Sequence, residues 1–163
     1  MIGRGPILTD GLVGLGPFEE AHCDRRYLAW FKNPTVRRFI KNRPTSLADA
    51  QCYVTGKLLD HACRFFSIYL GRKRVGTLKL ERGEPATVWY LGLMVGDPSA
   101  RGHGVGPRAI WLACCYAFDR LKAAEVRAGI DPENRASIRA FEKAGFEFEM
   151  ELFGQKMIAW KRR

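Results

Sequence analysis

The sequence predicts an α/β (α+β) fold in which a mixed, mostly antiparallel sheet of about six to seven strands is flanked by about four helices. Two kinds of apolar pattern predict it. Some segments repeat apolar residues every three or four positions, as amphipathic helices do, and others alternate or run continuously apolar between turn residues, as strands do. The chain has 163 residues and neither a linker nor an internal repeat, which indicates a single domain over residues 1–163.

Helical spacing and capping residues occur together in four segments. The predicted helices are residues 19–31, 47–58, 105–121 and 134–144. Pro34 ends the first helix, because the residue before a proline disfavours helical geometry. Ser46 is typical of a helix start, and Asn134 and Gly145 are suited to begin and end the last helix.

Six apolar runs bounded by turn residues predict strands. The predicted strands are residues 65–70, 75–81, 87–95, 126–130, 146–152 and 157–160. Short polar turns separate the first three runs, which favours an antiparallel meander. Residues 146–152 alternate acidic and apolar side chains, as a strand with one buried face does.

The chain is strongly basic, with 27 Lys and Arg against 17 Asp and Glu and a net charge of +10. Such a balance suits an anionic partner, namely nucleic acid, an anionic membrane or a phosphorylated small molecule; a basic surface that only serves solubility is the alternative. The cations lie in scattered pairs and triples and form no basic arm. The pattern therefore does not favour nucleic acid.

Cysteines and apolar runs exclude several other classes. The five cysteines are an odd number without a C-x-x-C pair, so we expect reduced thiols and no metal site. No apolar run approaches about 18 residues, and the first ten residues lack the apolar stretch of a signal peptide. We therefore expect a cytoplasmic protein that does not span a membrane.

The segment Arg101–Gly106 (RGHGVG) lies between a predicted strand and a predicted helix. Glycines at alternate positions let backbone N–H groups approach an anion closely, and the first turn of the helix adds further unpaired N–H groups. The segment is therefore suited to bind phosphate. A Walker A loop is excluded because Gly-Lys-Ser/Thr is missing, and a dinucleotide fingerprint is excluded because Pro107 stands where it needs glycine.

This segment resembles the pyrophosphate loop Gln/Arg-x-x-Gly-x-Gly/Ala of the GNAT N-acetyltransferase superfamily. Residues 91–97 (LGLMVGD) are similar to the family's bulged strand before that loop. Residues 133–138 (ENRASI) and 141–146 (FEKAGF) are similar to its second signature helix. The likeness covers residues 87–153, and the order of predicted elements from Glu19 onward agrees with it.

The resemblance implies that acetyl-CoA is the cosubstrate, without a metal, and lies between two diverging strands. The residues it assigns to acetyl-CoA are Leu93, Met94, Val95, Arg101, Gly102, His103, Gly104, Val105, Gly106 and Asn134. The reaction would be attack of a neutral amine on the thioester carbonyl, so the protein must orient the amine and manage its protons. Homodimers are common in the family, and one is expected here on that ground alone.

Both positions where many relatives carry an acid–base residue differ in this sequence. Phe141 stands where many have a tyrosine that protonates the departing thiolate, and Tyr90 stands where many have Glu or Asp. Three interpretations remain open. Tyr90 replaces one of these groups, Ser137 positions a water or the sulfur, or the site relies on proximity, since a thiolate of pKa about 8.5 leaves readily. The candidate catalytic residues are Tyr90 and Ser137.

The N-terminal region is expected to bind the acceptor. Residues 27–36 with Phe39 and Arg43 resemble a segment of two sub-groups: ribosomal-protein N-terminal and spermidine acetyltransferases, and enzymes that acetylate amino sugars on nucleotide carriers. The candidate acceptor-binding residues are Trp30, Arg37, Arg38 and Arg43. A nucleotide diphosphate suits these cations, whereas a polyamine would be repelled. A module that binds acetyl-CoA without transferring it is the alternative from another class.

Overall fold

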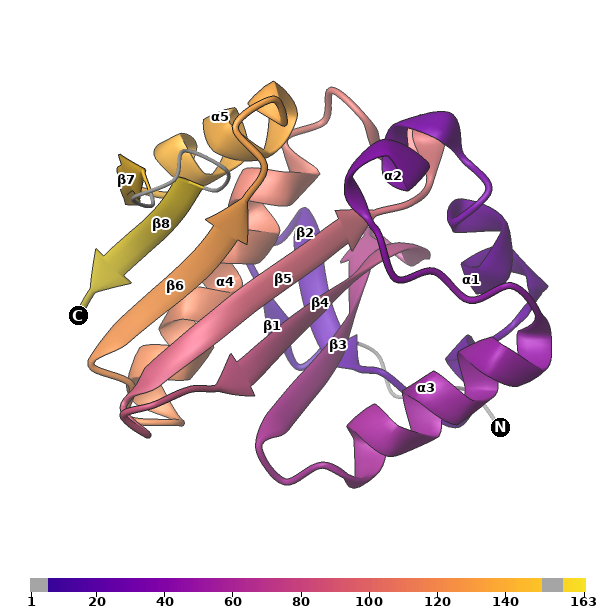
Figure 1. Ribbon diagram of the computed structural model, residues 1–163, viewed down its shortest axis with the longest axis horizontal. Coiled ribbons are helices and arrows are strands. Elements are labelled where there is room, and N and C mark those ends of the chain that lie inside the picture. The colour runs from indigo at the N-terminus through magenta and orange to yellow at the C-terminus, as the bar shows by residue number, and fades with distance from the viewer. Residues whose placement is uncertain (1–5, 151–156) are drawn as a thin grey trace.

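The computed structural model describes residues 6–150 and 157–163 and contains one eight-stranded sheet of order β1-β2-β3-β4-β5-β6-β8-β7 (Figure 1). The strands are β1 Leu8–Thr9, β2 Val13–Pro17, β3 Cys63–Leu70, β4 Lys73–Arg82, β5 Val88–Val95, β6 Glu125–Ile130, β7 Glu147–Met150 and β8 Met157–Arg162. All neighbouring strands are antiparallel except β5 and β6. The predicted mixed, mostly antiparallel sheet is confirmed, with more strands than expected.

Five α-helices and two short 3-10 helices accompany the sheet in the described residues. They are η1 Glu20–His22, α1 Arg25–Trp30, α2 Pro34–Phe39, α3 Leu47–Leu59, η2 Pro98–Ala100, α4 Val105–Asp119 and α5 Arg135–Lys143. The predicted helices 47–58, 105–121 and 134–144 agree with α3, α4 and α5 to within a few residues. No helix of the described chain is long and apolar enough to cross a membrane.

The N-terminal third differs most from the prediction. The single helix predicted over residues 19–31 was wrong, because Asp24 begins a new helix by accepting a hydrogen bond from the Tyr27 amide at 2.8 Å. Helix α2 was missed: Asn33 caps it through the Thr35 amide at 3.0 Å, and Pro34 occupies its first turn. The same Asn-Pro pair thus ends one helix and begins the next.

Strands β1 and β2 were also missed, because glycines in the segment VGLGP weaken its strand pattern. The predicted strand 146–152 is described only as far as residue 150, so its last two residues lie outside the described chain.

The sheet separates two apolar clusters. Helices α4 and α5 pack on one face, and α1, α2 and α3 pack on the other (Figure 1). Adjacent residues of β3 illustrate the alternation, since Phe65 joins the cluster of α1–α3 and Phe66 joins the cluster of α4. In β5, Leu91 lies with α4, whereas Met94 lies with α1–α3. Strand β5 therefore contributes side chains to both layers.

Strands β5 and β6 separate along their length. They pair in parallel only from Val88 to Tyr90 on β5 and from Glu125 to Arg127 on β6. Beyond this point β6 continues on β8, and β5 continues on β4 as far as Val95. The edge of residues 91–95 that faces β6 consequently has no strand partner, and its backbone groups are left for another ligand.

Close packing at the end of β5 gives a test of the fold. A Cβ atom on Gly96 would lie 2.3 Å from the buried Trp30 ring, so we expect Gly96→Ala to lower the free energy of unfolding by about 1–3 kcal/mol. Gly56, within α3, has open space where a side chain would stand, and Gly56→Ala should raise it by about 0.5–1 kcal/mol. Urea denaturation measures both; equal effects of the two substitutions would contradict the packing.

Candidate active site

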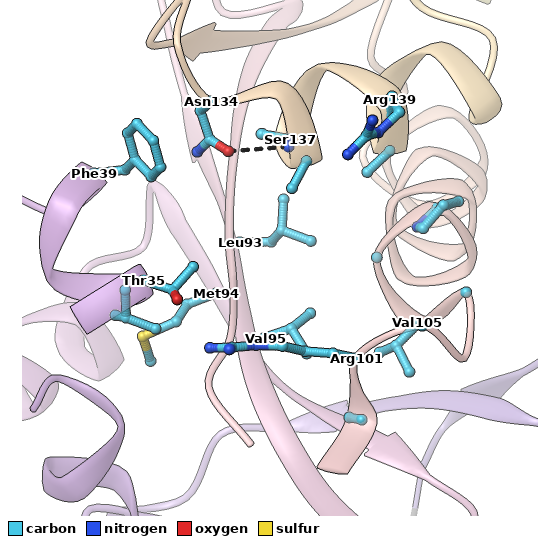
Figure 2. Close-up of a pocket in the computed structure, with 18 of the residues that line it drawn as sticks. Thr35, Phe39, Leu93, Met94, Val95, Arg101, Val105, Asn134, Ser137 and Arg139 are labelled. Carbon is cyan, nitrogen blue, oxygen red and sulfur yellow. Dashed lines mark hydrogen bonds between the residues drawn. The ribbon is translucent and has the colours of Figure 1, made fainter. Parts of the chain in front are cut away.

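A cavity of about 470 Å³ opens where β5 and β6 diverge (Figure 2). Strand β5 forms its floor with Leu93, Met94 and Val95, and α5 borders it with Asn134 and Ser137. The loop before α4 and one side of α2 complete the wall. Figure 2 shows Thr35 and Phe39 of α2 across the cavity from the loop that carries Arg101. We call this space the loop cavity.

The loop of residues 102–106 presents a row of unpaired amides to this cavity. Gly102 and Gly104 have φ angles of +76° and +67°, a backbone region that suits glycine. In the described chain, the amides of residues 102–106 form no hydrogen bond with another residue. Helix α4 then begins without an acidic residue in its first turn, so no carboxylate competes for these donors. The loop is therefore organised to bind an anion.

Asp97 holds the start of this loop in place. Its carboxylate accepts hydrogen bonds from the amide and hydroxyl of Ser99 at 2.9 and 2.7 Å and pairs with Lys73 at 2.8 Å. Burial alone would raise the pKa of Asp97, but the bonds from Lys73 and Ser99 outweigh it and lower that pKa to about 2. The carboxylate is therefore charged at neutral pH and fixes the turn that leads from β5 into the loop.

The side chains around the loop cavity are cationic where they are charged. Arg101, Arg139 and Lys143 line it, and no carboxylate of the described residues does. The sequence analysis missed Arg139 and Lys143. Their spacing of four residues on the predicted helix 134–144 puts them on one face, which is the signal that could have found them. No group of three His, Cys, Asp or Glu side chains in the part of the chain that the structure describes could hold a metal ion.

A second cavity of about 820 Å³ lies on the α1–α3 side of the sheet, and we call it the helix-side cavity. Ile40, Leu93 and Met94 line both cavities, so one wall separates them. Its other lining residues are Tyr27, Phe31, Lys41, Asn42, Arg43, Pro44, Asp49, Tyr53, Lys57, Phe65, Thr77, Lys79 and Gly92. Two molecules, one bound in each cavity, would therefore come closest to each other at the end of β5.

An ionic cluster forms the floor of the helix-side cavity. Lys57 of α3 is hydrogen-bonded to Glu81 of β4, and the Lys79 ammonium lies 3.6 Å from the same carboxylate. Lys79 also donates to the Tyr53 hydroxyl. Burial alone would raise the pKa of Glu81, but the two lysines outweigh it and hold that pKa below its ordinary value. The bond to Glu81 raises the pKa of Lys57, so the Lys57–Glu81 pair is charged at neutral pH.

Comparison with known proteins agrees with this geometry. Residues 13–147 match the sequence family described as the acetyltransferase (GNAT) domain. The chain belongs to the GNAT acetyltransferase family. Human alpha/beta-tubulin-N-acetyltransferase 9 is 26% identical over 160 residues, which cover 90% of this chain and 77% of the human protein.

Solved structures share the GNAT fold. The ribosomal L7/L12 alpha-N-protein acetyltransferase RimL, in complex with coenzyme A, superposes with a TM-score of 0.84 at 16% identity over 97% of this chain and 98% of RimL. The aminoglycoside acetyltransferase AAC(6')-Ib, also with coenzyme A, gives a TM-score of 0.80 at 20% identity over 93% and 95% of the two chains. At such identities these likenesses concern the fold.

The GNAT residues expected at the cosubstrate lie together. All of them except His103 line the loop cavity, and His103 is exposed on the same loop, with its ring nitrogen 2.9 Å from the Arg101 carbonyl. The Asn134 oxygen accepts a hydrogen bond from the Ser137 amide at 3.1 Å, which caps α5 (Figure 2). Its amide nitrogen is left over for a ligand. Asn134 is thus a helix cap that keeps a donor at the cavity.

The two candidate catalytic residues lie apart. Ser137 lines the loop cavity, whereas Tyr90 lies two residues before Gly92 on β5 and lines neither cavity. The Tyr90 ring covers Gly83, where a Cβ atom would lie 2.5 Å from it. Phe141 is buried and packs against Phe146, so it has a structural role in α5.

The four candidate acceptor residues are also divided. Arg43 lines the helix-side cavity, and its guanidinium donates to the Arg37 carbonyl at 2.6 Å. Arg38 is exposed and pairs with Glu133 at 2.9 Å, which links α2 to the start of α5. Trp30 is buried under Gly96 and lines neither cavity. Lys41, which the sequence places among the same cations, lines the helix-side cavity, as do Lys57 and Lys79, which the sequence analysis did not assign.

The left-handed glycine of the loop yields a test of anion binding. Gly104→Ala and Gly71→Ala both put a side chain at a positive φ angle, so each should cost about 1–2 kcal/mol in unfolding free energy. Gly71 lies in the turn between β3 and β4, far along the chain from the loop, and serves as the control. We expect only Gly104→Ala to weaken coenzyme A binding, by about ten-fold in Kd. Calorimetric titration measures this; equal weakening in both variants would contradict an anion site at the loop.

Proposed function

We propose that this GNAT protein transfers an acetyl group from acetyl-CoA in the loop cavity to an amine that enters through the helix-side cavity. The observation that carries the proposal is the wall shared by the two cavities, formed by Ile40, Leu93 and Met94. The two cavities adjoin at these residues, so a substrate bound in one would approach a substrate bound in the other at the end of β5. Holding both reactants in one geometry is a large part of what an acyl transfer needs.

The residues of the loop cavity fit acetyl-CoA. Unpaired amides of residues 102–106 match a pyrophosphate, and a Cβ atom on Gly102 would meet no atom within 4 Å, so the loop is open there. Arg139 and Lys143 add positive charge, and the unpaired edge of residues 91–95 offers backbone groups to the pantetheine amides. Bound there, acetyl-CoA supplies a thioester whose C–S bond breaks as the amine nitrogen forms the new C–N bond.

Proton transfer in this site relies on few side chains. Ser137 lines the loop cavity, and its backbone amide is bonded to Asn134. We assign its hydroxyl to position the departing sulfur or a water. Tyr90 remains a candidate from the sequence, although it lies outside both cavities. A thiolate of pKa about 8.5 leaves without a strong acid, so proximity at the shared wall supports most of the reaction.

For the acceptor we propose an amino sugar on a nucleotide carrier. Lys41 and Arg43 at the helix-side cavity suit its diphosphate, and the large volume suits a nucleotide-linked sugar. The N-terminus of a protein is the second candidate, favoured by the activity of RimL as an alpha-N-protein acetyltransferase; the human relative likewise acts on a protein, tubulin. A polycationic amine fits less well, because cations predominate in the lining. A cytoplasmic location and a homodimer stay predictions from the sequence.

The cosubstrate is tested by thermal unfolding with acetyl-CoA. At a concentration about 100-fold above its Kd, bound ligand should add about 2.7 kcal/mol to the free energy of unfolding and raise the Tm by about 5–10 °C. Release of free thiol is then followed with amino sugars, their nucleotide conjugates, polyamines and N-terminal peptides. We expect turnover with at least one anionic acceptor. No stabilisation would refute the cosubstrate, and stabilisation without any turnover would instead support a silent binding module.

The two catalytic candidates are compared by removing one hydroxyl at a time. We expect Ser137→Ala to lower kcat by about ten-fold, because Ser137 lines the loop cavity, and Tyr90→Phe to lower it less, because Tyr90 lines neither cavity. Steady-state thiol release with saturating acetyl-CoA measures both, and coenzyme A titration checks that binding is retained. A larger loss in Tyr90→Phe would move the proton-transfer role from Ser137 to Tyr90.

A further inference from the structure

Lys79 stands out among the cations of the helix-side cavity because it projects from the sheet itself. It lies on β4 directly opposite Gly92 of β5, so both residues face the α1–α3 side. The other cations of the cavity come from α3 and from the segment before it. Lys79 is therefore the cation that the sheet contributes to the cavity floor.

The charge of this floor is only partly neutralised. Lys57 and Lys79 share the single carboxylate of Glu81, and the direct hydrogen bond goes to Lys57. Of the described residues lining the cavity, only Asp49 is acidic, and its carboxylate is engaged by Thr45 at the start of α3. An ammonium group has three donors, and Lys79 uses one on the Tyr53 hydroxyl. Positive charge and donors thus remain for a ligand.

Gly92 leaves this ammonium open to the cavity. A side chain at position 92 would stand next to Lys79 on the same face, since directly opposed residues of antiparallel strands have Cβ atoms about 4.5–5.5 Å apart. No atom of the described chain lies within 4 Å of a Cβ built on Gly92, and Gly92 itself is exposed. The absence of a side chain therefore creates room for a ligand group beside the Lys79 side chain.

The strand register places Lys79 near the wall that the two cavities share. The pair Lys79–Gly92 precedes the pair Thr77–Met94 by two residues, and Met94 belongs to the wall shared with the loop cavity. At about 3.4 Å per residue the two pairs are about 7 Å apart. An acceptor whose amine lies at the shared wall could therefore extend along the sheet towards Lys79.

We propose that Lys79, supported by Tyr53 and Lys57, binds an anionic group on the part of the acceptor that lies beyond the acetylated amine, two residues along β4 from the shared wall. The proposal rests on the proposed function and makes Lys79 a specificity-determining residue. Phosphate of an amino sugar and the carboxylate of an acidic second residue in a peptide both meet this description. Lys79 discriminates by charge: a neutral or cationic group at the same place leaves the remaining donors of the ammonium without an anionic partner.

Binding of matched probes tests the role of Lys79 separately from turnover. Calorimetric titrations with and without saturating coenzyme A compare glucosamine 6-phosphate with glucosamine, and a Ser-Glu-Ala amide with a Ser-Gln-Ala amide. We expect at least one anionic probe to bind about ten-fold more tightly than its neutral partner, and this preference to fall as salt rises. Lys79→Met should remove the preference.

Arg72→Met is the matched control. It removes a cation from the turn between β3 and β4, outside both cavities, and should keep the preference. Urea denaturation of both variants checks the fold, since a purely structural role of Lys79 through Tyr53 would lower stability without changing the ratio of the two affinities. Lys57→Met, which removes the ammonium bonded to Glu81, should weaken the preference less than Lys79→Met.

Each outcome bears on the proposal. A preference confined to the sugar pair identifies phosphate as the anion, and one confined to the peptide pair identifies a carboxylate. Equal affinities within both pairs, no binding of any probe, or a preference that survives Lys79→Met would overturn it. Loss of acetyl-CoA binding and of turnover would refute the proposed function instead, and the titrations without coenzyme A would still decide the role of Lys79.

Discussion

The divergence of β5 from β6 is the constraint on which the site depends. Pairing stops at Tyr90 and Arg127, and from there each strand keeps only its other neighbour. An unpaired strand edge inside a domain leaves backbone donors and acceptors that must be satisfied. The loop cavity forms along this edge, α5 borders it, and the segment that leads to the loop of residues 102–106 begins where β5 ends. A fully paired sheet would leave no room between the two strands.

The end of β5 connects the two helical layers, α4–α5 on one face of the sheet and α1–α3 on the other, because its side chains alternate between them. Leu93 packs towards α4 and α5, and Met94 packs towards α1–α3, yet both line both cavities. Gly96 then lets the Trp30 ring approach the backbone closely. Asp97 and Lys73 fix the following turn, so the loop amides are held by a charged contact from the neighbouring strand. The geometry of the reaction is thereby set by the sheet.

Local patterns made much of this predictable, and long-range contacts made the rest unpredictable. The loop of residues 101–106 and the Asn134 cap are each encoded within a few neighbouring residues, so spacing alone predicted both. Helix α2 was missed because Asn-Pro indicates an end as readily as a start. The floor of the helix-side cavity joins α3, β4 and β5, and the bond between Lys57 and Glu81 spans 24 residues. No local signal predicts such a juxtaposition.

The structure shows where part of the net charge of +10 lies. Part of it lines the loop cavity as Arg101, Arg139 and Lys143, where no carboxylate among the described lining residues balances it. Another part lines the helix-side cavity, where Glu81 and Asp49 balance it incompletely. In the proposed reaction, an acceptor reaches the shared wall with its amine uncharged while its remainder lies among cations. Ammonium groups elsewhere on the acceptor would be repelled by the lining that an anion would satisfy. Under the proposed function, charge would therefore select the acceptor as well as the cosubstrate.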